Sequence, residues 1–318
     1  SVRGYNRHGY EFLKKFGVDN FGEVDFRAIR INKMPSRFRK KPLPTIKRTY
    51  AACTADGREF RFHRNTLDLF KEAVSNEPGL CDQVTYTEEP MYAPEHVGLK
   101  VLPKWTPREL QIPLIAYFNS PGSSKILNLQ TGQGKTYCSL TSSAHYGERL
   151  TICIESRFFN LWAEALDPDS DKQVLDLKKE EVLWIQGSKD LKALLQLAQT
   201  NQLDGIKVIV VALRTMANYI ETYTRFGEDM LSIYPVLPID FYKVTKTGTA
   251  LKDEVHLSLY ANYMEELFSH VPRRFSLSAT LEDGSFKDKI FGIMFPMDQR
   301  FDAGPLKQYI DVTALKYR

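Results

Sequence analysis

Residues 131–136, which read TGQGKT, hold the residue types that recognise a phosphate group. Gly132 and Gly134 can adopt backbone angles closed to other residues, and they leave backbone N–H groups open to a ligand. In a loop of this pattern, Lys135 reaches the outer phosphates and the Thr136 hydroxyl ligates magnesium. The pattern therefore predicts a phosphate-binding loop between a strand and a helix. The alternative is an ordinary glycine turn followed by an exposed lysine.

A second group of chemically active residues is the tetrad DEVH at residues 253–256. We expect Asp253 to hold magnesium through its water shell and Glu254 to orient or deprotonate the water that attacks a γ-phosphate. We expect His256 to link this site to moving parts of the protein. Alone, the tetrad also fits a charged loop with a hydrogen-bonded histidine. The residues before it, KVTKTGTALK, contain few apolar side chains and predict only a weak strand.

A third motif, Ser278-Ala279-Thr280, follows a short apolar stretch further along the chain. Its two hydroxyls are placed to hydrogen-bond the acids of the tetrad and to carry the state of a bound nucleotide to nucleic acid. The triplet is uninformative alone, and it gains meaning only from its order and distance after the other two motifs.

In this order the motifs resemble those of the first RecA-like domain of superfamily 2 DExH helicases and translocases, and residues 104–281 carry the resemblance. Leu129 stands where the general phosphate-loop pattern has its first glycine, and that departure also resembles these helicases. The resemblance implies an ATP hydrolase that uses ATP and Mg²⁺. It implies catalytic roles for Lys135, Asp253, Glu254 and His256, coupling roles for Ser278 and Thr280, magnesium ligation by Thr136 and Asp253, and ATP contacts by Arg108, Gln111, Thr131, Gly132, Gln133, Gly134, Lys135 and Thr136.

Two further segments extend the resemblance. RELQ resembles the motif on the adenine side, which would put Gln111 against the base and Arg108 nearby; the alternative is a plain amphipathic helix. VIVVALRTMANYI resembles a strand and helix that contact the nucleic-acid backbone, with Arg214 and Thr215 as candidate contacts or simple surface residues. Glu155-Ser156 departs from the proline and small residue that the family usually has.

From about residue 104 helical and strand patterns alternate, beginning with TPRELQIPLIAYF and SKILNL. Such alternation favours a mainly parallel sheet with helices on both faces, which binds ligands at the carboxyl ends of its strands. We predict a RecA-like α/β domain over residues 101–318 and a small α+β N-terminal domain over residues 1–100. In the smaller domain, Asp56-Gly57 predicts the turn of a hairpin and Asn65 the N-cap of a helix.

The formal net charge of +4 is unevenly distributed. Residues 1–50 carry 13 Lys and Arg against 4 Asp and Glu, and the remainder is acidic. The densest basic stretch, residues 33–48, predicts an extended arm on a phosphate backbone or a solvated linker. Its candidate nucleic-acid contacts are Arg37, Arg39, Lys40 and Lys41.

Composition narrows the class of protein. Hydrophobic and charged contents of 43% and 26% are ordinary for a globular protein, and no apolar stretch approaches the length of a membrane span. The four cysteines are scattered and form no C-x-x-C pair, so they predict neither a zinc site nor a disulfide framework. We expect a cytoplasmic protein, in the host cytoplasm if a phage encodes it.

A closer resemblance, to phage recombination helicases of the UvsW type, rests on the small N-terminal module, ILNLQTGQGKT and KDEVHLS. It implies a motor that couples ATP hydrolysis to remodelling of branched or duplex DNA, with DNA expected rather than RNA and with recombination or repair proteins as partners.

The family's second RecA-like domain does not fit in the 38 residues that follow Thr280. We therefore expect part of a longer helicase that binds ATP weakly, hydrolyses it slowly and does not unwind a duplex. Three alternatives stay open: a non-catalytic nucleic-acid-binding module with a motor fold, the motor of a restriction or repair translocase complex, and a P-loop kinase or small-molecule NTPase.

Overall fold

A seven-stranded sheet forms the centre of the molecule in the computed structural model, which describes residues 1–3, 6–34, 41–54, 57, 59–129, 132–279 and 284–302. The strand order is β12-β6-β11-β10-β7-β9-β8, and each of these pairings is parallel. The predicted α/β class with a mainly parallel sheet is confirmed. The strands are β6 Ser124–Asn128, β7 Leu150–Ile154, β8 Val182–Ile185, β9 Val208–Ala212, β10 Thr249–Lys252, β11 Arg273–Ser278 and β12 Arg300–Asp302.

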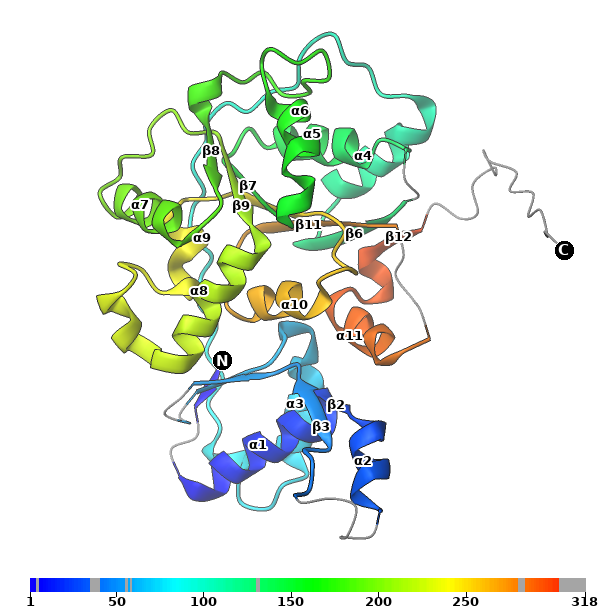
Figure 1. Ribbon diagram of the computed structural model, residues 1–318, viewed down its shortest axis with the longest axis vertical. Coiled ribbons are helices and arrows are strands. Elements are labelled where there is room, and N and C mark those ends of the chain that lie inside the picture. Colours follow the sequence, from blue (N-terminus) through cyan, green and yellow to red (C-terminus); the bar gives the residue numbers. More distant parts are fainter. Residues whose placement is uncertain are drawn as a thin grey trace, which may run out of the picture.

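Helices cover both faces of this sheet, as Figure 1 shows. One face packs on α4 Ile112–Asn119, α5 Lys135–His145 and α6 Phe159–Leu166. The other face packs on α7 Ser188–Gln199, α8 Leu213–Phe226, α9 Phe241–Val244, α10 Leu259–Leu267 and α11 Phe286–Met294.

Strand residues alternate between two apolar cores, because successive side chains of a strand point to opposite faces. In β7, Ile152 belongs to the core under α4, α5 and α6, whereas Cys153 belongs to the core under α10. Both are buried, as expected for a parallel sheet covered on each side. This continuous burial explains why the strands read as apolar runs in the sequence.

Strand β10 is the exception, because its residues are fully buried although the sequence predicted only a weak strand there. It lies in the middle of the sheet between β7 and β11. Its last residue, Lys252, is 0% exposed. Polar side chains of α10 pair with Lys252 and stabilise the strand. The hydrophobicity of the strand's own residues gives no sign of these partners.

The N-terminal module, defined here as residues 1–83, contains α1 Arg7–Phe21, α2 Phe26–Asn32 and α3 Leu67–Ser75. Two small sheets accompany them, β1-β5-β4 and β2-β3, and their pairings are antiparallel. Their strands are β1 Val2–Arg3, β2 Gly22–Val24, β3 Ile46–Thr49, β4 Ala52–Cys53 and β5 Glu59–Arg61.

The predicted hairpin is confirmed where β4 pairs with β5, and Gly57 has a positive φ of 70°. Asp56 lies outside the described residues. Asn65 is not the N-cap of α3, which begins after Thr66; its side-chain amide instead donates to the carbonyls of Ile293 and Met294 at the end of α11. The N-cap prediction was wrong because a tertiary partner competes for this side chain.

The module packs under α10 and α11, and its apolar residues join the core of that face of the sheet (Figure 1). The division into domains at residue 100 stays a prediction. None of the helices in the described part of the chain is long and apolar enough to cross a membrane.

Candidate nucleotide site

The glycine-rich loop connects β6 to α5, as the sequence predicted. Gly132 and Gly134 have φ values of 87° and 84°, which glycine adopts without the steric cost that a Cβ would bring. Helix α5 begins directly at Lys135, so the N-terminal end of an 11-residue helix faces the carboxyl edge of the sheet. Such a helix end favours an anion. Gln133 is half-buried in this loop, and Thr131 lies outside the described residues.

The lysine of the loop meets the acidic tetrad across the end of the sheet. Lys135 Nζ lies 2.6 Å from Glu254 Oε1, although the two residues are 119 positions apart in the chain. Their side chains are 10% and 16% exposed, so solvent reaches the pair. The fold thus brings the first two motifs together in one ion pair.

Glu254 has a strained backbone, with φ at 46°. A left-handed conformation is uncommon for a residue with a Cβ and is often found at functional sites. Its second carboxylate oxygen lies 3.3 Å from His256 Nδ1 and accepts a hydrogen bond from the Ala279 backbone at 3.4 Å. The side chain therefore contacts all three motifs.

His256 and Ser278 are in direct contact, with Nδ1 and Oγ 2.8 Å apart. Burial lowers the pKa of His256 below its ordinary value, while the Glu254 carboxylate acts in the opposite direction. Ser278 is completely buried at the end of β11. Thr280, the other predicted coupling residue, lies outside the described residues.

Asp253 is held by a residue that sequence reasoning missed. The indole of Trp162 donates to Asp253 Oδ2 at 3.1 Å, and the backbone N–H of Glu254 donates to Oδ1 at 2.9 Å. Burial raises the pKa of Asp253, and the Trp162 hydrogen bond opposes that effect. An isolated tryptophan in the pattern FFNLWAEAL resembles any core residue of an amphipathic helix, so no sequence signal distinguished it.

Gln111 packs directly against the phosphate loop. A Cβ on residue 134 would meet Gln111 Nε2, the mobile end of a side chain, and the positive φ of 84° is what favours glycine there. The Oε1 atom of Gln111 accepts a hydrogen bond from the Arg108 backbone at 3.0 Å. Gln111 is buried, whereas the Arg108 residue is exposed.

The predicted nucleic-acid contacts are scattered. Arg214 is exposed at the start of α8, but Thr215 is buried and its hydroxyl donates to the Gln186 carbonyl at 2.9 Å. Glu155, at the position that departs from the family pattern, accepts a hydrogen bond from Ser258, just after the tetrad. Lys41 is exposed, and Arg37, Arg39 and Lys40 lie outside the described residues.

The oxygen donors at this edge suit magnesium. Thr136 contributes a half-buried hydroxyl beside the loop, and Asp253 contributes a carboxylate whose position is set by Trp162. Mg²⁺ prefers oxygen ligands and usually combines one or two carboxylates with water and substrate phosphates. The described residues form no cluster of three His, Cys, Asp or Glu side chains that could hold a metal ion.

No known family profile and no curated protein sequence matches this chain. Among solved structures it is similar to the UvsW helicase of bacteriophage T4, at 14% identity over 91% of each chain and a TM-score of 0.45. It is also similar to the Hef helicase domain of Pyrococcus furiosus, at 16% identity and a TM-score of 0.39, covering 59% of this chain and 35% of that one.

A DEAD-box helicase bound to single-stranded RNA and UDP-BeF is similar at 17% identity and a TM-score of 0.35, over 58% of this chain and 38% of that one.

Proposed function

We propose that this chain is the ATP-hydrolysing motor of a nucleic-acid helicase or translocase. The observation that carries the proposal is the contact of Lys135 with Glu254 at the carboxyl ends of β6 and β10. A loop lysine and an acid placed together beside a helix N-terminus suit a site in which a phosphate separates the two and the acid faces a water molecule.

Each residue has a distinct role in this proposal. Lys135 leaves Glu254 and contacts the outer phosphates of ATP. Glu254 then orients or deprotonates the attacking water, and the 3.3 Å contact with His256 holds it for that task. Thr136 and Asp253 hold Mg²⁺, which neutralises charge on the phosphates when bound. Gln111, which lies against the loop, also contacts the adenine base in this proposal.

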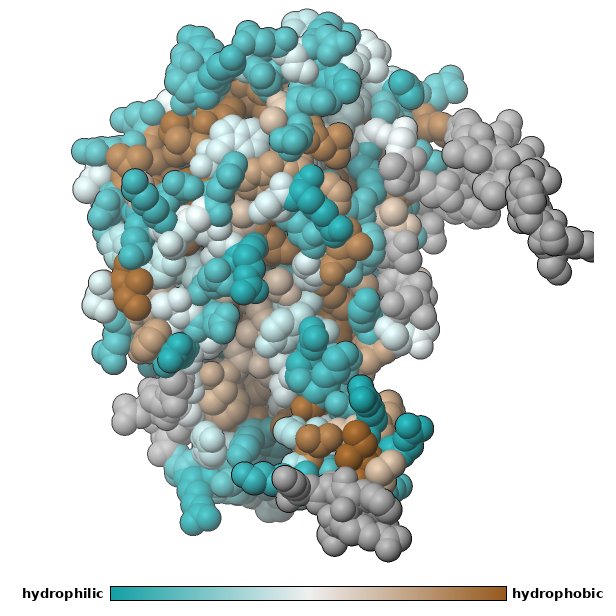
Figure 2. All heavy atoms as spheres, viewed as in Figure 1, coloured by the Kyte–Doolittle hydropathy of each residue, from teal (hydrophilic) through white to brown (hydrophobic). Residues whose placement is uncertain are grey.

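We propose that the N-terminal module supplies part of the nucleic-acid surface, with DNA as the polymer. On α2, Phe26 is 79% exposed, and Arg27 and Arg30 are exposed on the same short helix. Figure 2 shows apolar atoms gathered on this face over the β2–α2 region, where Val24 is also exposed. An aromatic ring beside cations is suited to stacking on a base while the cations contact phosphates.

ATP binding and turnover by the chain test the proposal, with and without single-stranded, duplex and branched DNA and RNA. We expect Lys135→Ala to weaken ATP binding at least about 100-fold, since it removes the charged contact to the phosphates. Glu254→Gln should keep binding and lose turnover. Lys189→Ala, which changes an exposed lysine on α7, is the control and should alter neither.

Stimulation by branched or duplex DNA would support a remodelling motor acting with recombination or repair proteins. Nucleic-acid binding that ignores ATP and falls steeply with salt would instead favour the non-catalytic module. ATP binding that is unchanged in Lys135→Ala would overturn the assignment of the loop.

A further inference from the structure

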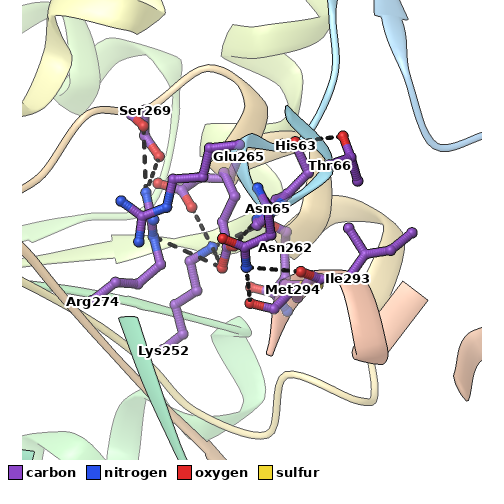
Figure 3. A network of polar contacts seen from close by, with 12 residues as sticks. His63, Asn65, Thr66, Lys252, Asn262, Glu265, Ser269, Arg274, Ile293 and Met294 are labelled. Carbon is purple, nitrogen blue, oxygen red and sulfur yellow. Dashed lines mark hydrogen bonds and ion pairs between the residues drawn. The ribbon is translucent and has the colours of Figure 1, made fainter. Parts of the chain in front are cut away.

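A buried cluster of charged side chains lies on the opposite side of β10 from α6, between the sheet and the N-terminal module (Figure 3). Its members are Lys252 on β10, Arg274 on β11, and Glu265 and Glu266 on α10; we call them the charge cluster. Lys252 Nζ pairs with Glu265 and lies 3.2 Å from Glu266 Oε1, and Arg274 Nε lies 3.8 Å from the same oxygen. Two cations therefore face two carboxylates.

The N-terminal module adds His63 to this cluster. His63 Nε2 lies 3.0 Å from Glu266 Oε2, and both side chains are almost completely buried. The other ring nitrogen, Nδ1, accepts a hydrogen bond from the Asn65 backbone at 3.3 Å. A backbone N–H can only donate, so the ring proton sits on Nε2 and is donated to Glu266. His63 is thus a hydrogen-bond donor that the N-terminal module supplies to Glu266.

Glu266 is connected to the acidic tetrad through α10. The cluster's Lys252 directly precedes Asp253, and its ammonium also donates to the Asn262 carbonyl at 3.0 Å. The side-chain amide of Asn262 donates to the carbonyl of Val255, inside the tetrad, at 3.2 Å. The position of α10 therefore sets the position of the residues around Glu254.

Further contacts hold the module against the same elements. Asn65 binds the last carbonyls of α11, and Arg61 donates to the Leu267 carbonyl at the end of α10 at 3.3 Å. The Tyr50 ring packs edge-on against Tyr260 and Tyr263 of α10. These contacts come from residues 50–65 of the module, and they hold α10 on the side that faces away from the sheet.

We propose that His63 is a positioning residue for the candidate ATP site: through Glu266 and α10 it holds the end of β10, so that the N-terminal module is part of the support of Asp253 and Glu254. This inference rests on the proposed function in one respect: it takes Asp253 and Glu254 to be the acids of an ATP site. It assigns the module a second role beside nucleic-acid binding, because a change in the position of the module would reach the tetrad through α10.

Hydrogen exchange of backbone amides tests this without nucleotide. We compare His63→Leu, which removes the donor, with His63→Gln, whose amide can replace Nε2–H. His63→Leu should speed exchange in residues 249–258 by about tenfold or more, as expected when a buried carboxylate loses a charge-assisted hydrogen bond. Residues 208–223, on β9 and α8, should exchange as before, and His63→Gln should restore most of the protection.

The matched control is His8→Leu, a change of the same kind in the same module. His8 pairs with Glu77 at 2.9 Å, but both side chains are substantially exposed. It should leave exchange in residues 249–258 unchanged. If His63→Leu does not fold, His63→Phe, which keeps a ring at this position and removes the donor to Glu266, takes its place with the same expected result.

Two results would overturn the proposal: unchanged exchange in residues 249–258 of folded His63→Leu, or an equal acceleration in residues 208–223. Nucleotide titration of the same samples separates the two levels of inference. Loss of protection in a chain that never binds ATP would contradict the proposed function and leave the positioning role intact. Unchanged protection of residues 249–258 in a His63→Leu chain that binds ATP would contradict the positioning role and leave the proposed function intact.

Discussion

Two lysine–glutamate contacts lie on either side of the end of β10, and they differ in what surrounds them. Lys135 and Glu254 meet at the edge of the sheet, where solvent reaches both side chains and Glu254 has a left-handed backbone. Lys252 and Glu266 meet below the sheet, with side chains 0% and 1% exposed and with Arg274 and His63 beside them.

The difference separates a contact that can exchange partners from one that cannot. A buried ion pair is stable only while each charge keeps its partner, because an uncompensated charge in a low-dielectric interior is very costly. An accessible pair can be replaced by a ligand, since a phosphate can take the place of the glutamate beside the lysine while water solvates the glutamate. The same residue types therefore serve as structure on one side of β10 and as candidate chemistry on the other.

The largest expected effect comes from Lys252→Met. It leaves Glu265 and Glu266 facing Arg274 alone, and we expect the free energy of unfolding to fall by about 3–5 kcal/mol. Chemical denaturation of the two proteins measures this difference in unfolding free energy. Lys135→Met is the matched substitution in the more accessible pair and should cost less, because solvent can reach the Glu254 carboxylate. Equal losses in the two variants would remove the distinction between the pairs.

Trp162→Phe should have an intermediate effect. It keeps an aromatic ring in the core but removes the donor to Asp253 Oδ2, a hydrogen bond to a charged group that is worth about 1.5–3 kcal/mol. Because burial already raises the pKa of Asp253, the variant should raise it further.

The loss in Trp162→Phe should therefore be present at neutral pH and disappear in acid, where Asp253 is protonated in both proteins and no carboxylate needs the indole. Denaturation at neutral pH and near pH 3 would check this, since about pH 3 lies below the ordinary pKa of an aspartate. A loss of the same size at both pH values would mean that packing, and not the hydrogen bond, is responsible.

Glu254→Gly should alter stability little while abolishing ATP turnover. Glycine relieves the left-handed backbone by about 1 kcal/mol, and this gain offsets the lost pair with Lys135. Denaturation curves and ATP turnover of the same preparation measure the two properties. A large loss of stability would show that the accessible pair is structural as well.

The smallest effect concerns His256 and pH. Burial lowers its pKa from an ordinary value near 6.5, so the folded protein favours the neutral ring and loses stability as the pH falls from 6.5 through the lowered value. In His256→Gln this part of the pH dependence should be absent, and the unfolding free energy should vary less between pH 7 and pH 5. An unchanged profile would assign the titration to other groups.

The sequence carried most of the candidate site because its residues lie in local motifs. The glycines of the loop predict their own positive φ values, and the strand–loop–helix pattern places Lys135 at a helix N-terminus. The meeting of Lys135 with Glu254 could be inferred only through the resemblance. The role of Trp162 was not predicted, because the sequence of an amphipathic helix does not indicate which distant residue its buried tryptophan hydrogen-bonds.

By itself, the sequence determined the α/β class, the phosphate-loop conformation and the order of the motifs, since glycine chemistry and hydrophobic periodicity act over a few neighbouring residues. The tertiary structure alone decided the existence of β10 as a central strand, the cap that Asn65 provides to α11 and the contact of His63 with Glu266. Those features depend on charges and donors that are distant in the chain, and a buried charge is stable only where the fold brings its partners together.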